Sequence, residues 1–123
     1  MHELALAANI LDIVCQSAKE NDLERVTGIW VASGELMGVV FDALEFGFEI
    51  ASSNTVAAGA KLNFRELPAI IRCDACGNRY LWKTHGYTCP RCSHLGGEMI
   101  QGKEFYIDYI QGDRKEDEKN GSD

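Results

Sequence analysis

Four of the five cysteines stand at the spacing of a metal site. They form two C-x2-C pairs, Cys73 with Cys76 and Cys89 with Cys92, separated by twelve residues. Two such pairs can direct four thiolates at one ion, and Zn²⁺ accepts four thiolates in a tetrahedron. Iron in a rubredoxin-like site is the chemical alternative, because tetrahedral sulfur ligation suits either metal. Four thiolates leave no position for water, so we interpret the site as structural and not catalytic.

The residues around these cysteines predict a small folded module. Gly77 follows Cys76 where the first turn needs a positive φ, and a proline follows Cys89 in the second turn. The twelve residues between the pairs are predicted to form a hairpin. We interpret His85 and His94 as exposed loop residues, and the alternative is that one of them replaces a thiolate.

A second candidate for metal chemistry is the histidine at position two. A free amino terminus at Met1, the deprotonated amide of residue two and the imidazole of His2 can chelate one ion through two fused rings. Such a nitrogen set suits square-planar or tetragonal Ni(II) or Cu(II). Taken by chemistry alone, the alternative is that His2 is only a solvated terminal residue.

The elements that must position these residues are predicted from hydrophobic periodicity. Three- and four-residue spacing predicts helices over 3–19 and 41–51, and alternation or β-propensity predicts strands over 25–32, 60–66 and 104–110. We assign Leu4, Phe46 and Ile50 to the apolar stripes of the two helices, and Cys15 to the core as a packed thiol. The predicted fold class is α+β, a three-stranded sheet with two helices on one face.

The four-cysteine module is then a small zinc-ribbon-like insertion before the last strand. We predict a discontinuous α/β domain over 1–68 and 102–111, and a metal-binding domain over 69–101. Residues 112–123 contain no aliphatic or aromatic side chain, so we expect a disordered acidic tail.

Composition and charge argue against some classes of protein. The net charge is −7, and residues 1–66 alone carry −6, which opposes general binding to nucleic acid. The rival prediction is a zinc-ribbon nucleic-acid module, because basic and aromatic residues interleave within it: Arg72, Arg79, Tyr80, Trp82, Lys83, Tyr87 and Arg91. Thiolate charge offsets that basic character. No apolar run suffices to span a bilayer and no signal peptide is visible, so we expect a cytoplasmic protein.

Catalytic motifs are missing from the sequence. It contains no G-x-S-x-G elbow, no phosphate-binding glycine loop and no H-E-x-x-H stretch. Cys15 has no visible partner for nucleophilic catalysis. We therefore expect a protein that is not an enzyme.

Several short blocks, in order along about residues 1–111, resemble the HypA/HybF nickel-incorporation proteins. The blocks are MHEL at the start, RVTGIW and SGEL, FGFE, TVAAGA, and the two cysteine pairs. Each block is modest alone, and their ordered set is specific.

The resemblance implies a nickel metallochaperone that delivers Ni(II) to [NiFe]-hydrogenase precursors and, in some organisms, to urease. It assigns nickel to His2 with the amine of Met1 and the backbone amide of Glu3, and structural zinc to the four cysteines. Further nickel ligands vary among relatives, and here Val40 can contribute only through its main chain. The implied partners are a HypB-type GTPase, the hydrogenase large-subunit precursor and urease accessory proteins. The alternatives are a purely structural adaptor, in which His2 is incidental, and the nucleic-acid module above.

Overall fold

The structure is a computed structural model that describes residues 3–115 of the 123. Within this range the chain forms an α+β fold, as predicted, with six strands, three helices and one 3₁₀ turn. In chain order these are α1 (Glu3–Glu20), β1 (Leu23–Gly34), η1 (Glu35–Met37), α2 (Phe41–Ala51), β2 (Lys61–Leu67), β3 (Ile70–Cys73), β4 (Arg79–Leu81), α3 (Trp82–His85), β5 (Gly97–Gln101) and β6 (Phe105–Arg114).

The chain divides into two compact units. Of the described residues, those up to Val31, Val39–Phe64 and those from Ile107 onward form the first unit. Ala32–Gly38 and Arg65–Tyr106 form the second unit. The second unit contains the predicted module of residues 69–101 and extends beyond it. Whether the predicted domain boundaries mark parts that fold on their own stays a prediction.

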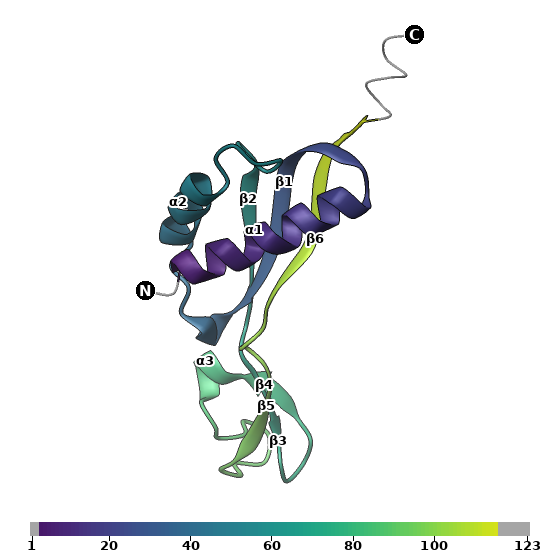
Figure 1. Cartoon of the computed structure of the whole chain (residues 1–123). Coiled ribbons are helices and arrows are strands. Elements are labelled where there is room, and N and C mark those ends of the chain that lie inside the picture. The colour runs from purple at the N-terminus through teal and green to yellow at the C-terminus, as the bar shows by residue number, and fades with distance from the viewer. Residues whose placement is uncertain (1–2, 116–123) are drawn as a thin grey trace. The chain divides into compact units, whose positions relative to one another are not determined.

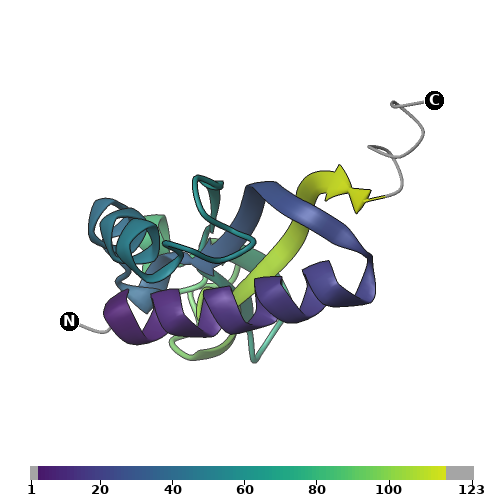
Figure 2. The same ribbon diagram turned by 45° about the horizontal axis from the view of Figure 1, so that its top comes forward.

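The first unit is built on a three-stranded sheet in the order β2-β1-β6. Helix α1 runs across these strands and packs against α2, as Figures 1 and 2 show. The apolar periodicity of α1 explains its placement, because Ala7, Ile10, Val14 and Ala18 recur at three- and four-residue steps and are all buried. Helix α2 is held to the sheet by Phe41, whose ring stacks on Phe64 of β2 with a centroid separation of 4.4 Å. The predicted helices and sheet are therefore confirmed.

Part of the predicted core stripe lies at the surface. Leu4, Phe46 and Ile50 are 70%, 65% and 59% exposed, so their assignment to the core was wrong. The reason lies in the helix period: α2 buries Leu44 and Phe48, and two residues span about 200° of a helix. Phe46 stands two residues from both of them and therefore points away from the sheet.

The last strand is longer than predicted. The sequence indicates a strand ending at Ile110 and a tail from Gly112, but β6 continues to Arg114. At Gly112 a β-carbon would overlap the carbonyl oxygen of Arg25, so only glycine permits this close approach of the two backbones. The remaining part of the predicted tail, residues 116–123, lies outside the described residues.

The second unit contains an antiparallel sheet in the order β4-β3-β5, with Ile71 opposite Tyr80 and Arg72 opposite Glu98. The predicted hairpin between the two cysteine pairs was wrong. Strand β4 instead pairs back to β3 across the first cysteine pair, and the short helix α3 follows it. An isolated bridge between Thr88 and Leu95 encloses the second pair in the same way. Each C-x2-C pair is therefore the turn of its own hairpin.

No helix among residues 3–115 combines the length and the hydropathy that crossing a membrane requires.

Candidate metal centre

The two cysteine turns share one backbone pattern. In the first turn, the Cys73 N–H donates to the Asn78 carbonyl at 2.8 Å, and the Gly77 N–H donates to the Cys73 carbonyl at 3.0 Å. In the second, the Cys89 N–H donates to the His94 carbonyl at 3.0 Å, and the N–H four residues after Cys89 donates to its carbonyl at 2.9 Å. The two C-x2-C pairs therefore lie in turns with equivalent backbone hydrogen bonds.

Both turns need a left-handed residue four positions after the first cysteine. Gly77 has a φ of 77°, which confirms the predicted role of this glycine. Ser93 occupies the equivalent place with a φ of 66°. Sequence reasoning missed Ser93, although the signal was present, because Ser93 follows Cys89 at the same distance at which Gly77 follows Cys73.

The four sulfur atoms converge on one point. Cys73 Sγ lies 3.6 Å from Cys92 Sγ, Cys76 Sγ lies 3.6 Å from Cys89 Sγ, and all four lie within 4.8 Å of one another. Four sulfurs each about 2.3 Å from a tetrahedral zinc ion would be about 3.8 Å apart. Among the described residues this cluster contains no histidine, so His85 and His94 stand outside it. The donor set therefore fits a tetrahedral thiolate metal centre.

Backbone amides favour the thiolate form of two of these cysteines. The Cys76 N–H lowers the pKa of Cys73 against the opposing effect of burial. Burial raises the pKa of Cys89, but the N–H groups of Cys92 and Arg91 outweigh it and lower this pKa from 9.0 to about 6. The Arg91 nitrogen lies 3.4 Å from the Cys89 sulfur. Both thiols are thus prepared to lose a proton and ligate a cation.

The fourth sulfur shows how strongly the cluster, without a compensating charge, opposes full ionisation. The His94 N–H favours the thiolate of Cys92, but burial and the three neighbouring sulfurs raise its pKa to about 12. Like charges at this separation disfavour full ionisation of the cluster. A divalent cation removes this conflict by compensating the thiolate charge at its centre.

The predicted nickel site is described only in part. Met1 and His2 lie outside the described residues, whereas Glu3 begins α1. The Val40 N–H donates to Glu3 Oε2 at 3.3 Å, and the Val40 carbonyl accepts from the Leu44 N–H at 3.0 Å. Both backbone groups of Val40 are therefore engaged within the protein, and the carboxylate of Glu3 links the start of α1 to the start of α2.

Two of the basic and aromatic residues of the module make contacts within it. Tyr80 is buried, and its ring lies edge-on to His85 with a centroid separation of 6.0 Å. Arg72 pairs with Glu98, with 2.5 Å between Nη2 and Oε1. Two members of the predicted nucleic-acid surface are therefore committed to contacts inside the module.

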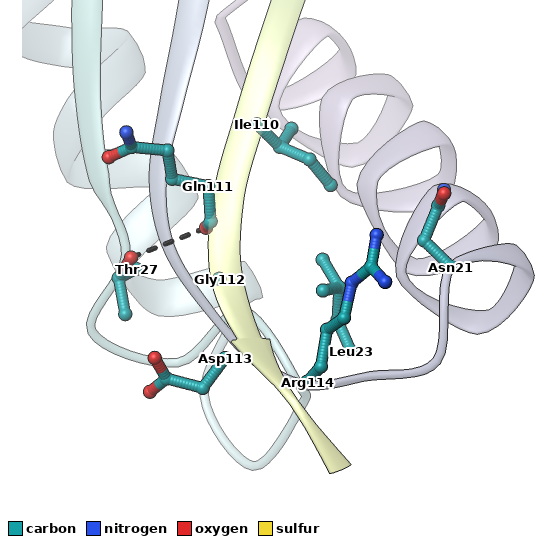
Figure 3. Close-up of a pocket in the computed structure, with 8 residues that line it drawn as sticks. All are labelled: Asn21, Leu23, Thr27, Ile110, Gln111, Gly112, Asp113 and Arg114. Atoms are coloured by element: carbon teal, nitrogen blue, oxygen red, sulfur yellow. Dashed lines mark hydrogen bonds between the residues drawn. The ribbon is translucent and has the colours of Figure 1, made fainter. Parts of the chain in front are cut away.

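A cavity of about 570 Å³ lies elsewhere in the first unit, at the end of β6 (Figure 3). Thr27 Oγ1 donates to the Gln111 carbonyl across its wall at 3.3 Å. Its lining contains neither cysteine nor histidine: Asn21, Leu23, Thr27, Ile110, Gln111, Gly112, Asp113 and Arg114. Asp113, the acid among them, pairs with Arg25 at 2.7 Å. This cavity offers no ligand set for a soft metal.

Cys15 stands apart from both sites. The sequence predicts a thiol packed in the core, but Cys15 is only half-buried on α1. Burial, with a contribution from Asp12, raises the pKa of its thiol. A raised pKa makes a thiol a poor nucleophile, so nothing at Cys15 supports catalysis.

Comparison with known proteins identifies the family. The family model described as "Hydrogenase/urease nickel incorporation, metallochaperone, hypA" matches residues 1–112. A hydrogenase maturation factor HypA of Dehalococcoides mccartyi is 36% identical over 113 residues, which cover 92% of this chain and 95% of that protein. The factor of the same name from Chloroflexus aurantiacus is 38% identical over 108 residues, covering 87% and 95%.

Solved structures agree with the fold. The solution structure of the Ni metallochaperone HypA from Helicobacter pylori has a TM-score of 0.68 at 18% identity and covers 94% of this chain and all of that one. A second solution structure of a HypA protein has a TM-score of 0.72 at 19% identity, covering 91% and 96%.

The fold and the cysteine cluster define a small α+β protein with a candidate thiolate metal centre. The chain belongs to the HypA family of nickel-incorporation metallochaperones that serve hydrogenase maturation. The family description is that of a metallochaperone, as the sequence resemblance implies.

Proposed function

We propose that this chain carries one Ni(II) ion at its N-terminus and one structural Zn²⁺ ion between its four cysteines. The nickel ligands are the amine of Met1, the backbone amide and imidazole of His2, and the backbone amide of Glu3. The observation that carries the proposal is the family match over residues 1–112, which includes the N-terminal histidine and both cysteine pairs. The convergence of the four sulfurs supports the zinc part.

Nitrogen ligation suits the task of a nickel carrier. Amine, amide and imidazole nitrogens favour a planar site, which Ni(II) and Cu(II) accept and Zn²⁺ does not prefer. Because Cu(II) binds such ligands more tightly than Ni(II), selection depends on metal supply and on the partner that receives the ion. The contact between the Glu3 carboxylate and the Val40 N–H restrains the first turn of α1, to which the proposed Glu3 amide ligand belongs.

The zinc ion has a structural role in this proposal. Four thiolates close the coordination sphere, so the metal has no position for a water or a substrate. Its binding supplies folding free energy to a module whose own apolar core is small.

The expected partners follow from the family. We propose a HypB-type GTPase as co-worker and the large-subunit precursor of [NiFe]-hydrogenase as recipient, in the cytoplasm. Urease, reached through its accessory proteins, is the second proposed client of the same mechanism, because the family description includes urease.

Native mass spectrometry of the untagged, zinc-loaded chain with one equivalent of Ni(II) tests the nickel site. We expect one zinc and one nickel ion per chain, and loss of nickel alone in His2→Ala. His85→Ala is the matched control, because it removes an exposed imidazole from another part of the chain. A variant with Gly-Ser added before Met1 keeps His2 but removes the amine from its position, and it should also lose nickel.

Nickel affinity should fall from about pH 8 to about pH 6, because the imidazole and amide must lose protons to bind the ion. An affinity that does not change over this range contradicts nitrogen ligation at the terminus. Hydrogenase maturation that survives His2→Ala in cells at ordinary nickel supply would replace this proposal with the adaptor role. Zinc alone, with no nickel in either the parent chain or the variant, would do the same.

A further inference from the structure

Helix α2 presents a second apolar strip on the side that faces solvent. Its inner side buries Leu44 and Phe48, which attach it to the first unit. Phe46 and Ile50, four residues apart, lie together on the outer side and are 65% and 59% exposed. A helix that needed only one buried face would carry polar residues at these positions.

The strip continues onto α1. Gly47 is buried on α2 three residues before Ile50, so the two positions are neighbours on the helix surface. Leu4 of α1 lies against Gly47, with Leu4 Cδ2 3.1 Å from the place a Gly47 β-carbon would occupy. Leu4 is itself 70% exposed. Leu4, Phe46 and Ile50 therefore form one exposed apolar surface that bridges two packed helices, which we call the α2 strip.

Acidic side chains border the α2 strip on one side. Asp42, Glu45 and Glu49 follow each other at steps of three and four residues, and α2 contains no lysine or arginine. Glu45 and Glu49 stand one turn apart, which is unfavourable for like charges on an isolated helix. The helix thus shows solvent an apolar strip with a purely anionic edge.

A cavity lies beside this anionic edge. It has a volume of about 300 Å³ and is lined by Glu45, Phe48, Glu49, Ser52, Gly59, Ala60 and Leu62. Two carboxylates thus stand at the wall of a cavity whose floor includes the buried ring of Phe48. A long basic side chain fits such a place, because its alkyl stem packs on the apolar floor while its charge meets the carboxylates.

We propose that the α2 strip and its anionic edge are the docking surface for a partner protein that presents a basic amphipathic helix. The apolar face of that helix covers Leu4, Phe46 and Ile50, and its lysine or arginine side chains meet Glu45 and Glu49. Charge complementarity selects this occupant, because a second copy of the same α2 surface would bring like charges together. The proposal does not rest on the nickel site.

Fluorescence anisotropy with a labelled helical peptide of about 18 residues, or about five turns, tests this surface. The peptide carries leucine on one face and lysine on the other, and a second peptide replaces every lysine with glutamate. Both are titrated with the full, zinc-loaded, nickel-free chain at about 0.15 M ionic strength, where remote charges are screened. We expect the lysine peptide alone to bind.

Two variants remove the two parts of the surface. Phe46→Ser combined with Ile50→Ser removes the apolar strip, and Glu45→Lys combined with Glu49→Lys reverses the anionic edge. Each should weaken binding of the lysine peptide at least tenfold. The matched control combines Ile13→Ser with Glu20→Lys on α1, where an apolar and an acidic side chain are also exposed. It should change binding less than twofold.

Circular dichroism of every variant confirms that the fold is kept, as the exposure of these side chains predicts. Equal weakening by the control variant would show that only net charge and general hydrophobicity matter, and it overturns the proposal. Binding of the glutamate peptide, or no binding of the lysine peptide, overturns it as well.

Discussion

The two units of this protein are stabilised in different ways. The first has an apolar core in which two helices pack on a sheet, with Ile10, Val14, Ile29, Leu44 and Phe48 fully buried. The main cluster of the second consists of Ile71, Cys73, Tyr80 and Cys89, so half of its members are thiols that belong to the metal centre. Burial of apolar surface can fold the first unit, whereas we expect the second to depend on the metal ion proposed for its four cysteines.

Removal of the metal should have the largest effect, and it should unfold the second unit while the first stays folded. A chelator that extracts zinc should unfold the sheet β4-β3-β5, because the cysteine turns then bring together thiolates without a compensating charge. Two-dimensional NMR should show loss of dispersion for residues 70–101 and native shifts for α1 and α2. Native shifts throughout the metal-free chain would contradict the proposed dependence on metal.

Loss of one ligand should have the next largest effect. Cys76→Ser should lower zinc affinity by more than about 100-fold, because one of four thiolates is removed. Competition with a chromophoric chelator measures the change. Cys15→Ser is the matched control, because this cysteine lies outside the cluster. A similar loss of zinc in both variants would argue against the site.

In the first unit, Phe46 and Phe48 of α2 should contribute very differently to the free energy of unfolding. Phe48→Ala should lower the free energy of unfolding by about 3–5 kcal/mol, since it leaves a cavity beneath α2. Phe46→Ala should change it by less than about 0.5 kcal/mol, because that ring is mostly exposed. Denaturant unfolding followed at the first unit measures both, and zinc content should not change. Equal effects of the two substitutions would show that α2 does not bury Phe48 and expose Phe46 as the structure has them.

Acid should weaken zinc binding in steps. The pKa of Cys89 lies at about 6 instead of 9.0, so its thiolate persists at neutral pH and its contribution is lost as the pH falls through 6. Below that point zinc affinity should decrease about tenfold per pH unit for each proton taken up. A titration from about pH 8 to about pH 5 tests this, and a flat profile across pH 6 would oppose the assignment.

The smallest effect is expected where α1 meets α2. Glu3→Ala removes the acceptor of the Val40 N–H and should lower the free energy of unfolding of the first unit by about 0.5–1.5 kcal/mol. Glu24→Ala, at an exposed position of β1, is the control and should have a smaller effect. No difference between them would show that the 3.3 Å contact contributes nothing to stability.

Local patterns were predictable from the chain alone. The helix period identified α1 and α2, alternation identified β2 and β6, and cysteine spacing identified the four sulfurs that converge. These features depend on interactions between residues near in sequence, or on a ligand motif whose geometry is local. Gly77 was predictable for the same reason, since one turn requires its positive φ.

Features that depend on distant residues were not predictable. Periodicity placed Phe46 and Ile50 beside the core, but the place where the sheet meets α2 decides which side of that helix is buried. The extension of β6 to Arg114 depends on its approach to β1 at Gly112, and the pairing of β4 with β3 depends on which segments close each cysteine turn.

The sequence by itself determined helices α1 and α2, the strands that alternate and the four cysteines that converge, because helix period, strand alternation and cysteine spacing depend on residues near one another in the chain. Tertiary structure alone decided the exposed apolar strip of α2, the length of β6 and the directions in which the pKa values of the thiols are shifted. Each of these depends on contacts between segments far apart in the chain, or on charges that only the fold brings together.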